Sequence, residues 1–345
     1  QLQMESKLNT TNNLKIAIDG MGGDFAPQVP VEGAILAAKK GASQILLVGD
    51  EEVLKKELSK YETEGLPIKI IPSEGIIHDH ESPALALRQK PKSSILVATN
   101  LVKTGMADAI ISMGSSGATM AAAVVILGTI NGIERPAIGG PIIGSAPNQV
   151  ILDLGSNIDC KPSNLVGFGV LGSVFSQVLL GIESPKIGIL SVGSEEGKGN
   201  GLVKETTKLF HQSGLNFIGN VEGNDLLTGK ADVVVCDGFV GNVILKLVEG
   251  FGRGFAKQLK ETLSSHMNNQ DLEGLLNEFS KKNNIVDSRG GGPVFGVNGV
   301  SIIGHGSSSA KTVDRAVDLA LMCINTKLIE EMNNQTPEIM STISN

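Results

Sequence analysis

The stretch of sequence that decides the fold spans residues 16–24 and has the sequence IAIDGMGGD. An apolar run with β-branched residues ends in an aspartate and enters a glycine-rich turn, a pattern typical of a buried strand followed by a loop. Residues 27–40 follow, with apolar residues at helical spacing. The first N–H groups of a helix lack partners within it, and glycine lets the backbone approach a ligand closely. The stretch therefore predicts either an anion site or an ordinary tight turn of an α/β protein.

Composition narrows the class of protein. The chain has 345 residues, of which 41% are hydrophobic, and a net charge of −7. This length fits one large or two ordinary domains with a sizeable core. No cluster of basic residues occurs, so we expect no nucleic-acid partner. The three cysteines are far apart and in no metal-ligand spacing, which favours a reducing compartment and argues against a disulfide framework or a zinc site.

Targeting signals and chain ends give further expectations. No segment reaches the roughly 18 uninterrupted apolar residues of a membrane span. Residues 1–13 are polar and lack the apolar centre of a signal peptide, so we expect a disordered or artificial extension there. We expect a single α/β/α catalytic domain over residues 14–333 and a flexible tail over residues 334–345.

Apolar strands alternate with helical segments along nearly the whole chain. This alternation predicts an α/β fold with a mostly parallel sheet and helices on both faces, in which ligands bind beyond the carboxyl ends of the strands. We expect strands at 14–18, 45–48, 68–71, 109–112, 150–154, 187–192, 217–218, 233–236 and 300–303. We expect helices at 30–40, 51–61, 93–105, 117–128, 162–180, 201–213, 239–262, 271–282 and 309–333.

Two helical segments stand apart from this rhythm. Residues 164–180 are apolar on nearly every side, which predicts either a central core helix or a subunit interface. Residues 240–284 predict two helices that meet near 264–271 with no strand between them, and so a helical hairpin that projects from the sheet. Its apolar residues could pair within the hairpin, form a dimer contact or bind a membrane surface.

Polar clusters follow several of the expected strands. Ser115 and Ser116 open a helix and could bind a phosphate or carboxylate, or could simply cap that helix. Arg88 and Lys90 lie near further hydroxyls and could grip an anion or form a solvated patch. Similar clusters occur at 153–162, 191–200, 222–224, 237–242 and 304–309. Their repetition at equivalent strand ends predicts a polar active cleft.

Familiar catalytic motifs are missing from these clusters. The chain has no Gly-x-Ser-x-Gly elbow and no Walker sequence, and the turn at Gly22–Gly23 lacks the G-x-G-x-x-G fingerprint, which argues against a serine hydrolase and a dinucleotide site. Cys160 could be a thiol nucleophile but has no histidine near it in sequence, and small buried cysteines are common. His78 and His80 favour a solvated loop over a metal pair. His305 lies between a strand and a helix, where a role in the site and a core position are equally open.

The motifs also carry a resemblance. Residues 19–24, DGMGGD, resemble the N-terminal signature of the PlsX family, the phosphate acyltransferases of bacterial phospholipid synthesis. The resemblance extends from about residue 15 to 330 through RQK with SS at 88–94, GIERPA at 132–137, DLG with DC at 153–160, EGNDLL at 222–227, CDGF with GN at 236–242, and HG at 305–306. The family usually has Asn-Thr at 115–116 and a Glu-rich turn at 194–196. Both departures keep small or polar groups, so they bear on individual contacts more than on the activity.

The resemblance implies a reaction and a fold. An acyl group would pass from acyl-[acyl carrier protein] to inorganic phosphate, giving acyl phosphate and free carrier protein. The implied fold is a three-layer α/β/α structure, isocitrate/isopropylmalate dehydrogenase-like and phosphotransacetylase-like, in a homodimer. The family's product passes to a membrane glycerol-phosphate acyltransferase, which implies a cytoplasmic protein loosely associated with the membrane, with the 240–284 hairpin as the candidate contact.

The chemistry and the resemblance together give a set of candidate residues. We expect direct attack of phosphate on the thioester, with no covalent enzyme intermediate, no metal and no cofactor. The expected catalytic residues are His305, Asn242, Asn157 and Lys198. The expected substrate-binding residues are Asp19, Gly22, Gly23, Asp24, Arg88, Lys90, Ser115, Ser116, Gly117, Asp159, Glu195, Glu222, Asn224, Asp237 and Gly306. Phosphate is expected on backbone N–H groups near Gly22–Gly23 and 115–117, and the acidic carrier protein on Lys246, Arg253, Lys257 and Lys260, which could equally form a solvated face.

Two other classes of function stay open from the sequence. One is a related enzyme, either a phosphotransacetylase that acts on acyl-CoA or a dehydrogenase of the same fold. The other is a non-catalytic scaffold that binds acyl carrier protein. The number of polar clusters argues against the scaffold, because a scaffold does not need so many polar groups at strand ends.

Overall fold

The computed structural model describes residues 14–283 and 288–343. They form two compact units. The first comprises the residues up to Pro136 together with Arg289–Gln335, and the second comprises Ala137–Ser288 together with the residues from Thr336 onward. The extension predicted for residues 1–13 lies outside the described residues.

The first unit is built on a mostly parallel sheet with the strand order β3-β2-β1-β4-β11-β10, in which β10 alone of these runs antiparallel to its neighbour β11. Its strands are β1 (Lys15–Asp19), β2 (Gln44–Gly49), β3 (Ile68–Pro72), β4 (Ala109–Ser112), β10 (Gly292–Phe295) and β11 (Val300–Ile303). Its helices are α2 (Gln28–Lys39), α3 (Glu51–Leu58), α4 (Pro83–Gln89), α5 (Ser94–Lys103), α6 (Ser116–Ala122), which continues as the π-helical turn Ala123–Leu127, and α12 (Ala310–Asn325).

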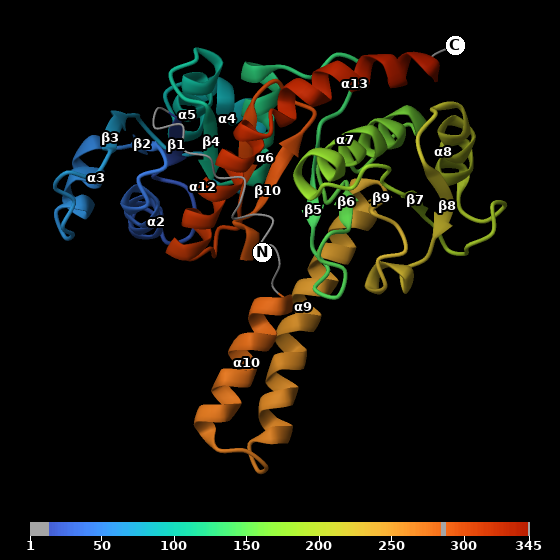
Figure 1. Ribbon diagram of the computed structural model, residues 1–345. Coiled ribbons are helices and arrows are strands. Elements are labelled where there is room, and N and C mark those ends of the chain that lie inside the picture. The colour runs from blue at the N-terminus through green and yellow to red at the C-terminus, as the bar shows by residue number, and fades with distance from the viewer. Residues whose placement is uncertain (1–13, 284–287, 344–345) are drawn as a thin grey trace. The chain divides into compact units, whose positions relative to one another are not determined.

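Strands β1, β2, β4 and β11 of this unit are buried on both faces. On one face Ala17 and Ile110 pack with Leu101 of α5 in a single apolar cluster. On the other face α2 and α12 pack closely together, so closely that a Cβ at Gly33 would collide with the side chain of Val313. In Figure 1, α5 and the pair α2 and α12 lie on opposite sides of β1 and β4. The continuous apolar runs of these strands are explained by this burial between two helical layers.

The second unit has the strand order β5-β6-β9-β7-β8, in which β5 is antiparallel to β6 and the other pairs are parallel. Its strands are β5 (Ala137–Pro141), β6 (Val150–Leu152), β7 (Ile187–Leu190), β8 (Phe217–Val221) and β9 (Val233–Val235). Its helices are α7 (Pro162–Leu180), α8 (Gly201–Gln212), the 3₁₀ turn Asp225–Leu227, α9 (Gly238–Leu263) and α10 (Asn269–Asn283). The expected α/β class with mostly parallel strands is confirmed.

Helix α7 is the apolar helix predicted over 162–180. It has 19 residues and a mean hydropathy of 1.5, so its length and composition would suit a membrane span. However, 78% of its apolar window is buried within the protein, against β6 and β9. Gly169 and Gly172 allow this packing, because a Cβ there would meet the rings of Phe210 and the side chain of Val233 at 2.7 and 2.5 Å. The segment is the core helix of this unit, one of the two alternatives that the sequence left open.

Helices α9 and α10 form the expected hairpin, which projects away from the strands of the second unit (Figure 1). Along α9 an apolar residue recurs at every fourth position, and these side chains are substantially exposed. The ring of Phe255 packs across the hairpin on Phe279, with ring centroids 5.3 Å apart. Intramolecular pairing therefore covers part of the apolar surface and leaves a stripe uncovered. The stripe consists of Phe239, Val243, Leu247, Phe251 and Phe255.

Several elements differ from the sequence-based expectation. Strands β5 and β10 were missed because both contain glycine and proline, which strand patterns disfavour. A single helix was expected over 309–333, but the structure has two helices there, α12 and α13 (Leu328–Thr342). Lys327 lies between them with a φ of 55°, which a continuous α-helix does not allow. A flexible tail was expected from residue 334. This expectation was wrong as far as Thr342, because α13 extends to that residue even though it contains Pro337. Helix α4 was also missed.

Candidate functional site

In each unit the candidate residues gather at the carboxyl edge of parallel strands. In the first unit they follow β1, β4 and β11, which are adjacent in the sheet. In the second unit they follow β6, β9, β7 and β8, which are adjacent in that order. The parallel direction of these strands explains why residues far apart in sequence meet at one edge.

The first-unit site begins with Asp19 at the end of β1, whose side chain is 1% exposed. One carboxylate oxygen accepts a hydrogen bond from the Met21 N–H at 3.1 Å, and the other accepts one from the Ser112 hydroxyl at 2.8 Å. Burial raises the pKa of Asp19, and these hydrogen bonds oppose that rise. Gly22 must lack a side chain, because a Cβ would lie 2.5 Å from Asp19 Oδ2 and 2.8 Å from the Gly114 nitrogen.

The turn after β1 is tied to the turn after β11. The Asp24 N–H donates to the Gly306 carbonyl at 2.8 Å, and Gly23 reaches this position with a φ of 104°. A Cβ at Gly306 would lie 2.7 Å from a carboxylate oxygen of Asp24. Half-buried His305 precedes Gly306. The structure thus brings together Gly23, Asp24 and Gly306 of the expected set, with His305 adjacent in the chain.

The expected anion-binding groups of this unit differ in how far their hydrogen bonds are already used within the chain. The Gly22 N–H already donates to the Asp19 carbonyl, and the Ser115 side chain caps α6 by accepting from the Ala118 N–H. Lys90 is engaged by Glu81, at 2.7 Å, and by the Ile76 carbonyl, at 2.8 Å. The remaining residues of this set are exposed. They are Arg88 at the end of α4, and Ser116 and Gly117 at the start of α6.

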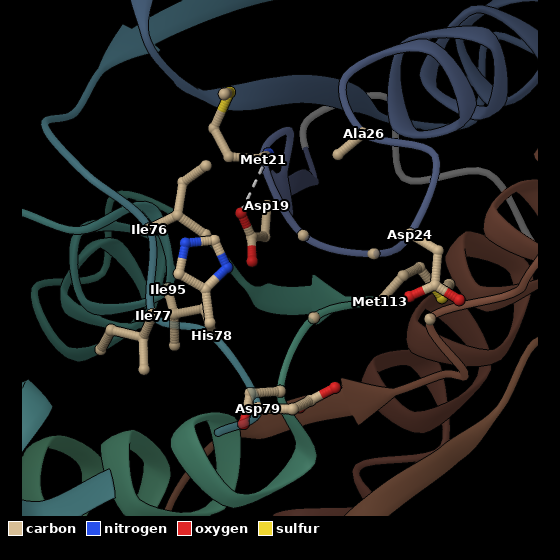
Figure 2. Close-up of a pocket in the computed structure, with 15 residues that line it drawn as sticks. Asp19, Met21, Asp24, Ala26, Ile76, Ile77, His78, Asp79, Ile95 and Met113 are labelled. Carbon is tan, nitrogen blue, oxygen red and sulfur yellow. Dashed lines mark hydrogen bonds between the residues drawn. The ribbon is translucent and has the colours of Figure 1, made fainter. Parts of the chain in front are cut away.

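A pocket of about 260 Å³ opens beside the Asp19 turn (Figure 2). It is lined by Asp19, Met21, Gly22, Gly23, Asp24, Ala26, Ile76, Ile77, His78, Asp79, Ile95, Met113, Gly114, Ser115 and Gly306. These described lining residues include three aspartates but no lysine or arginine. The pocket therefore offers hydrogen-bond acceptors and apolar surface rather than positive charge.

The second-unit site is organised by Asp153, which follows β6 and is fully buried. Its Oδ1 accepts from the backbone N–H groups of Ile138, Gly155 and Ser156 at 3.2, 3.2 and 3.1 Å. Its Oδ2 accepts from the Asn157 N–H at 2.7 Å and from the Asn157 side-chain amide at 2.9 Å. Burial raises the pKa of Asp153, and the hydrogen bonds oppose that rise. Asp153 thereby fixes the conformation of the loop and the orientation of the Asn157 amide.

The start of α9 packs directly on this loop. Gly241 contacts the Asp153 carbonyl so closely that a Cβ could not fit, and a Cβ at Gly238 would lie 2.7 Å from the Asn157 carbonyl. Asp237 caps the helix by accepting from the Val240 N–H at 2.8 Å. A Cβ at Gly155 would lie 3.4 Å from the exposed Asn242 side chain. The two asparagines expected in catalysis, 157 and 242, therefore flank one short loop.

The other expected residues of this unit lie along the same edge. Glu195 and Lys198 are exposed in the loop after β7, and that loop is held by the buried Asn220 amide, which donates to the Gly193 and Glu195 carbonyls at 3.2 and 2.8 Å. Asp159 lies exposed in the Asp153 loop. Half-buried Glu222 and exposed Asn224 follow β8.

Two of the cysteines lie near the Asp153 loop. Cys236 is buried, its thiol lies 3.7 Å from the Asp153 carbonyl, and burial raises its pKa far above the ordinary range. Cys160 is half-buried and its thiol donates to the Asn157 carbonyl at 3.4 Å. A protonated thiol is a poor nucleophile, so Cys236 is not suited to acyl transfer.

Sequence reasoning gave no role to three residues that position loops of the candidate site. These are Ser112, which donates to Asp19; Asp153, whose five accepted hydrogen bonds shape the loop after β6; and Asn220, whose side-chain amide holds the loop after β7. Ser112 ends β4 and Asp153 directly follows β6, which is the signal that could have found these two, whereas Asn220 lies within β8. What the sequence could not give is the partner of each side chain, since those partners lie far along the chain or in loop backbone.

Comparison with known proteins identifies the family. A family model described as "Fatty acid synthesis protein" matches residues 14–331. The chain belongs to the fatty acid synthesis protein family. Relatives in this family include the phosphate acyltransferases of Pelotomaculum thermopropionicum, 44% identical over 330 residues (94% of this chain and 96% of the relative), and of Clostridium acetobutylicum, 41% identical over 329 residues (94% and 99%).

The fold of this fatty acid synthesis protein family member is also found in solved structures. A phosphotransacetylase from Streptococcus pyogenes matches with a TM-score of 0.62 and 18% identity, covering 95% of this chain and 97% of its own. A branched-chain phosphotransacylase from Enterococcus faecalis matches with a TM-score of 0.52 and 17% identity, covering 90% and 99%. At these identities the likeness concerns the fold alone, and it confirms the expected phosphotransacetylase-like architecture. The relatives of this chain are named phosphate acyltransferases, so the chain is an enzyme of the acyltransferase class.

Proposed function

We propose that the protein transfers a fatty acyl group from acyl-[acyl carrier protein] to inorganic phosphate, in the synthesis of phospholipid precursors. The observation that carries this proposal is the close relationship to phosphate acyltransferases over 94% of the chain. The polar loops at the carboxyl edges of both sheets supply groups for such a reaction. A scaffold would have no need of them.

The reaction needs no covalent enzyme intermediate. A phosphate oxygen attacks the thioester carbonyl carbon, the new C–O bond forms, and the carbonyl electrons move to oxygen. Collapse of this tetrahedral intermediate breaks the C–S bond, and the carrier thiolate leaves with the electron pair and takes a proton from solvent. Positioning both reactants can supply roughly 7–11 kcal/mol of the barrier, so binding groups suffice for much of the catalysis.

The oxyanion of the intermediate needs hydrogen-bond donors. We assign this role to the side-chain amides of Asn157 and Asn242, which flank the Asp153 loop. Asp153 pre-orients the Asn157 amide, and loss of one such donor typically lowers kcat by about 10²–10³-fold. Exposed Lys198 is the proposed partner of phosphate in this unit, and His305 the proposed group for substrate contact in the first unit. Asp159, Glu195, Glu222, Asn224 and Asp237 are proposed to frame the same edge.

The hairpin is the proposed contact with other molecules. Its exposed apolar stripe suits loose peripheral association of a cytoplasmic homodimer with the membrane surface, where a glycerol-phosphate acyltransferase would receive the acyl phosphate. Exposed Arg253, Lys257 and Lys260 are proposed to attract the acidic carrier protein. Lys257 lies 3.9 Å from Glu261, so its charge is partly balanced within the helix.

The deciding experiment mixes purified protein with palmitoyl-carrier protein, with and without phosphate. Carrier release is followed while acyl phosphate is trapped with hydroxylamine. Phosphate-dependent release with a trapped hydroxamate supports the proposal. Release without phosphate would identify a thioesterase, and a preference for palmitoyl-CoA would favour a phosphotransacetylase. Carrier binding without release would favour the scaffold.

Variants connect this activity to the geometry. We expect Asn242→Ala to lower kcat by about 100-fold or more with an unchanged melting temperature, since the side chain is exposed and is expected to act only as a donor. Asn100→Ala is the matched control, because Asn100 is exposed on α5 away from the candidate site. Equal activity of Asn242→Ala and the wild type would remove Asn242 from the mechanism. An acyl group trapped on Cys160 would refute direct attack.

A further inference from the structure

The pocket beside the Asp19 turn has two kinds of wall. Ile76, Ile77 and Ile95 supply apolar surface, and Figure 2 shows them grouped on one side of the view. Asp24 lies on the other side of the view, and Asp19 lies between the two groups. The pocket thus has three isoleucines and the His78 ring on one side and hydrogen-bond acceptors on the other.

Charge argues against phosphate as the occupant. Asp19, Asp24 and Asp79 line the pocket, and the described lining residues contain no lysine or arginine. Carboxylates repel a phosphate anion at short range, and the low dielectric around buried Asp19 strengthens that repulsion. The N–H groups of Met21, Gly22 and Asp24 also donate within the chain already.

The acceptor groups of the pocket also argue against a bare acyl chain as its occupant. A hydrocarbon would cover the acceptor oxygens of exposed Asp24 and Asp79 without replacing the hydrogen bonds that water gives them, and such desolvation is costly. The suited occupant is a neutral, flexible ligand that carries N–H and O–H donors along one part and apolar carbon along another.

We propose that this pocket binds the pantetheine arm of the thioester donor. The amide N–H and hydroxyl groups of the arm would donate to the carboxylates, and its geminal methyl groups would pack on the isoleucines. This inference rests on the proposed function, because it takes the donor to be a carrier-protein thioester. It assigns the residues around Gly22 and Gly23 to the acyl donor rather than to phosphate.

The test compares two small donors with the same reactive thioester. Decanoyl-pantetheine carries the arm, whereas the decanoyl thioester of N-acetylcysteamine lacks most of it. We expect wild-type protein to use decanoyl-pantetheine with a kcat/KM about tenfold higher or more. Ala26→Leu adds bulk at a lining position, so it should lower kcat/KM for decanoyl-pantetheine by about tenfold and leave the shorter donor unchanged.

Two further variants keep the result interpretable. Ala42→Leu adds the same bulk at a half-buried position outside the pocket and should leave both donors unchanged. Ile76→Ala removes part of the apolar wall without adding bulk, so it should also lower kcat/KM for decanoyl-pantetheine alone. It provides a second reading if Ala26→Leu lowers the melting temperature.

The outcomes separate the two proposals. Equal effects of Ala26→Leu and Ile76→Ala on the two donors, or no effect of either, would overturn the pantetheine assignment while the transferase stands. If the wild type forms no acyl phosphate from palmitoyl-carrier protein or from either small donor, the proposed function itself fails. Equal kcat/KM values of the wild type for the two donors would also overturn the assignment.

Discussion

Replacing Asp153 by asparagine tests how the second-unit loop is held. In the wild type Oδ1 accepts from three backbone N–H groups, and Oδ2 accepts from the Asn157 N–H at 2.7 Å and its side-chain amide at 2.9 Å. An asparagine keeps one acceptor oxygen, but its NH₂ group then faces two donors. Leaving a buried donor unsatisfied costs about 1–3 kcal/mol, so the loss is about 2–6 kcal/mol.

One effect acts in the opposite direction. Burial raises the pKa of Asp153, which means that holding its charge costs stability, and the neutral amide removes that cost. We therefore expect Asp153→Asn to lower the free energy of unfolding at pH 7 by about 2–4 kcal/mol.

Urea denaturation followed by circular dichroism measures this loss, with Asp159→Asn as the control in the same loop. Asp159 is exposed, so its substitution should change stability by less than about 0.5 kcal/mol. Indistinguishable curves for Asp153→Asn and the wild type would refute the view that this carboxylate organises the loop. We also expect kcat to fall, because the Asn157 amide loses its orientation.

Three further predictions follow from single residues. Burial raises the pKa of Asp19 above its ordinary value of 3.8, so the wild type loses stability as the pH rises through that raised pKa. The melting temperature of Asp19→Asn, measured relative to that of the wild type, should therefore increase from pH 4 to pH 7. A difference that does not change with pH would contradict this. Gly22→Ala should cost about 1–3 kcal/mol in urea titrations through the 2.5 Å contact with Asp19. Gly250→Ala, in open space on α9, should instead raise stability by about 0.5–1 kcal/mol, because alanine favours the helix; equal effects of the two changes would count against the tight turn. Asp237→Ala should cost about 1 kcal/mol by removing the α9 cap, measured by thermal unfolding, and Asp237→Asn should restore most of it.

The fold was largely predictable because the central strands of both sheets, such as β4, β6 and β9, are buried on two faces. Runs such as residues 16–18 and 233–235 are apolar throughout, and burial of both faces requires this. The missed strands β5 and β10 contain Gly139, Pro141 and Pro293, which local preference places in turns. Their pairing partners override that preference, and partners far along the chain are not visible to a local pattern.

The site was predictable in position more than in detail. Polar residues after strands correctly marked the carboxyl edges of both sheets, because parallel strands bring those ends together. The cap formed by Ser115 was one of two alternatives that the sequence offered, whereas the pairing of Lys90 with Glu81 was not predictable. Both outcomes depend on loop geometry between residues that the sequence does not pair.

Helix α9 links the Asp153 loop to the far end of the hairpin through 26 continuous residues, a length of about 39 Å at 1.5 Å per residue. Its first turn is fixed by the close contacts of Gly238 and Gly241, so the helix has little freedom to rotate at that end. Each residue inserted or deleted beyond Asn242 would turn the hairpin tip by about 100° around the axis. The number of residues in α9 therefore sets the direction in which the apolar stripe faces, and a change of four residues would turn it by only about 40°.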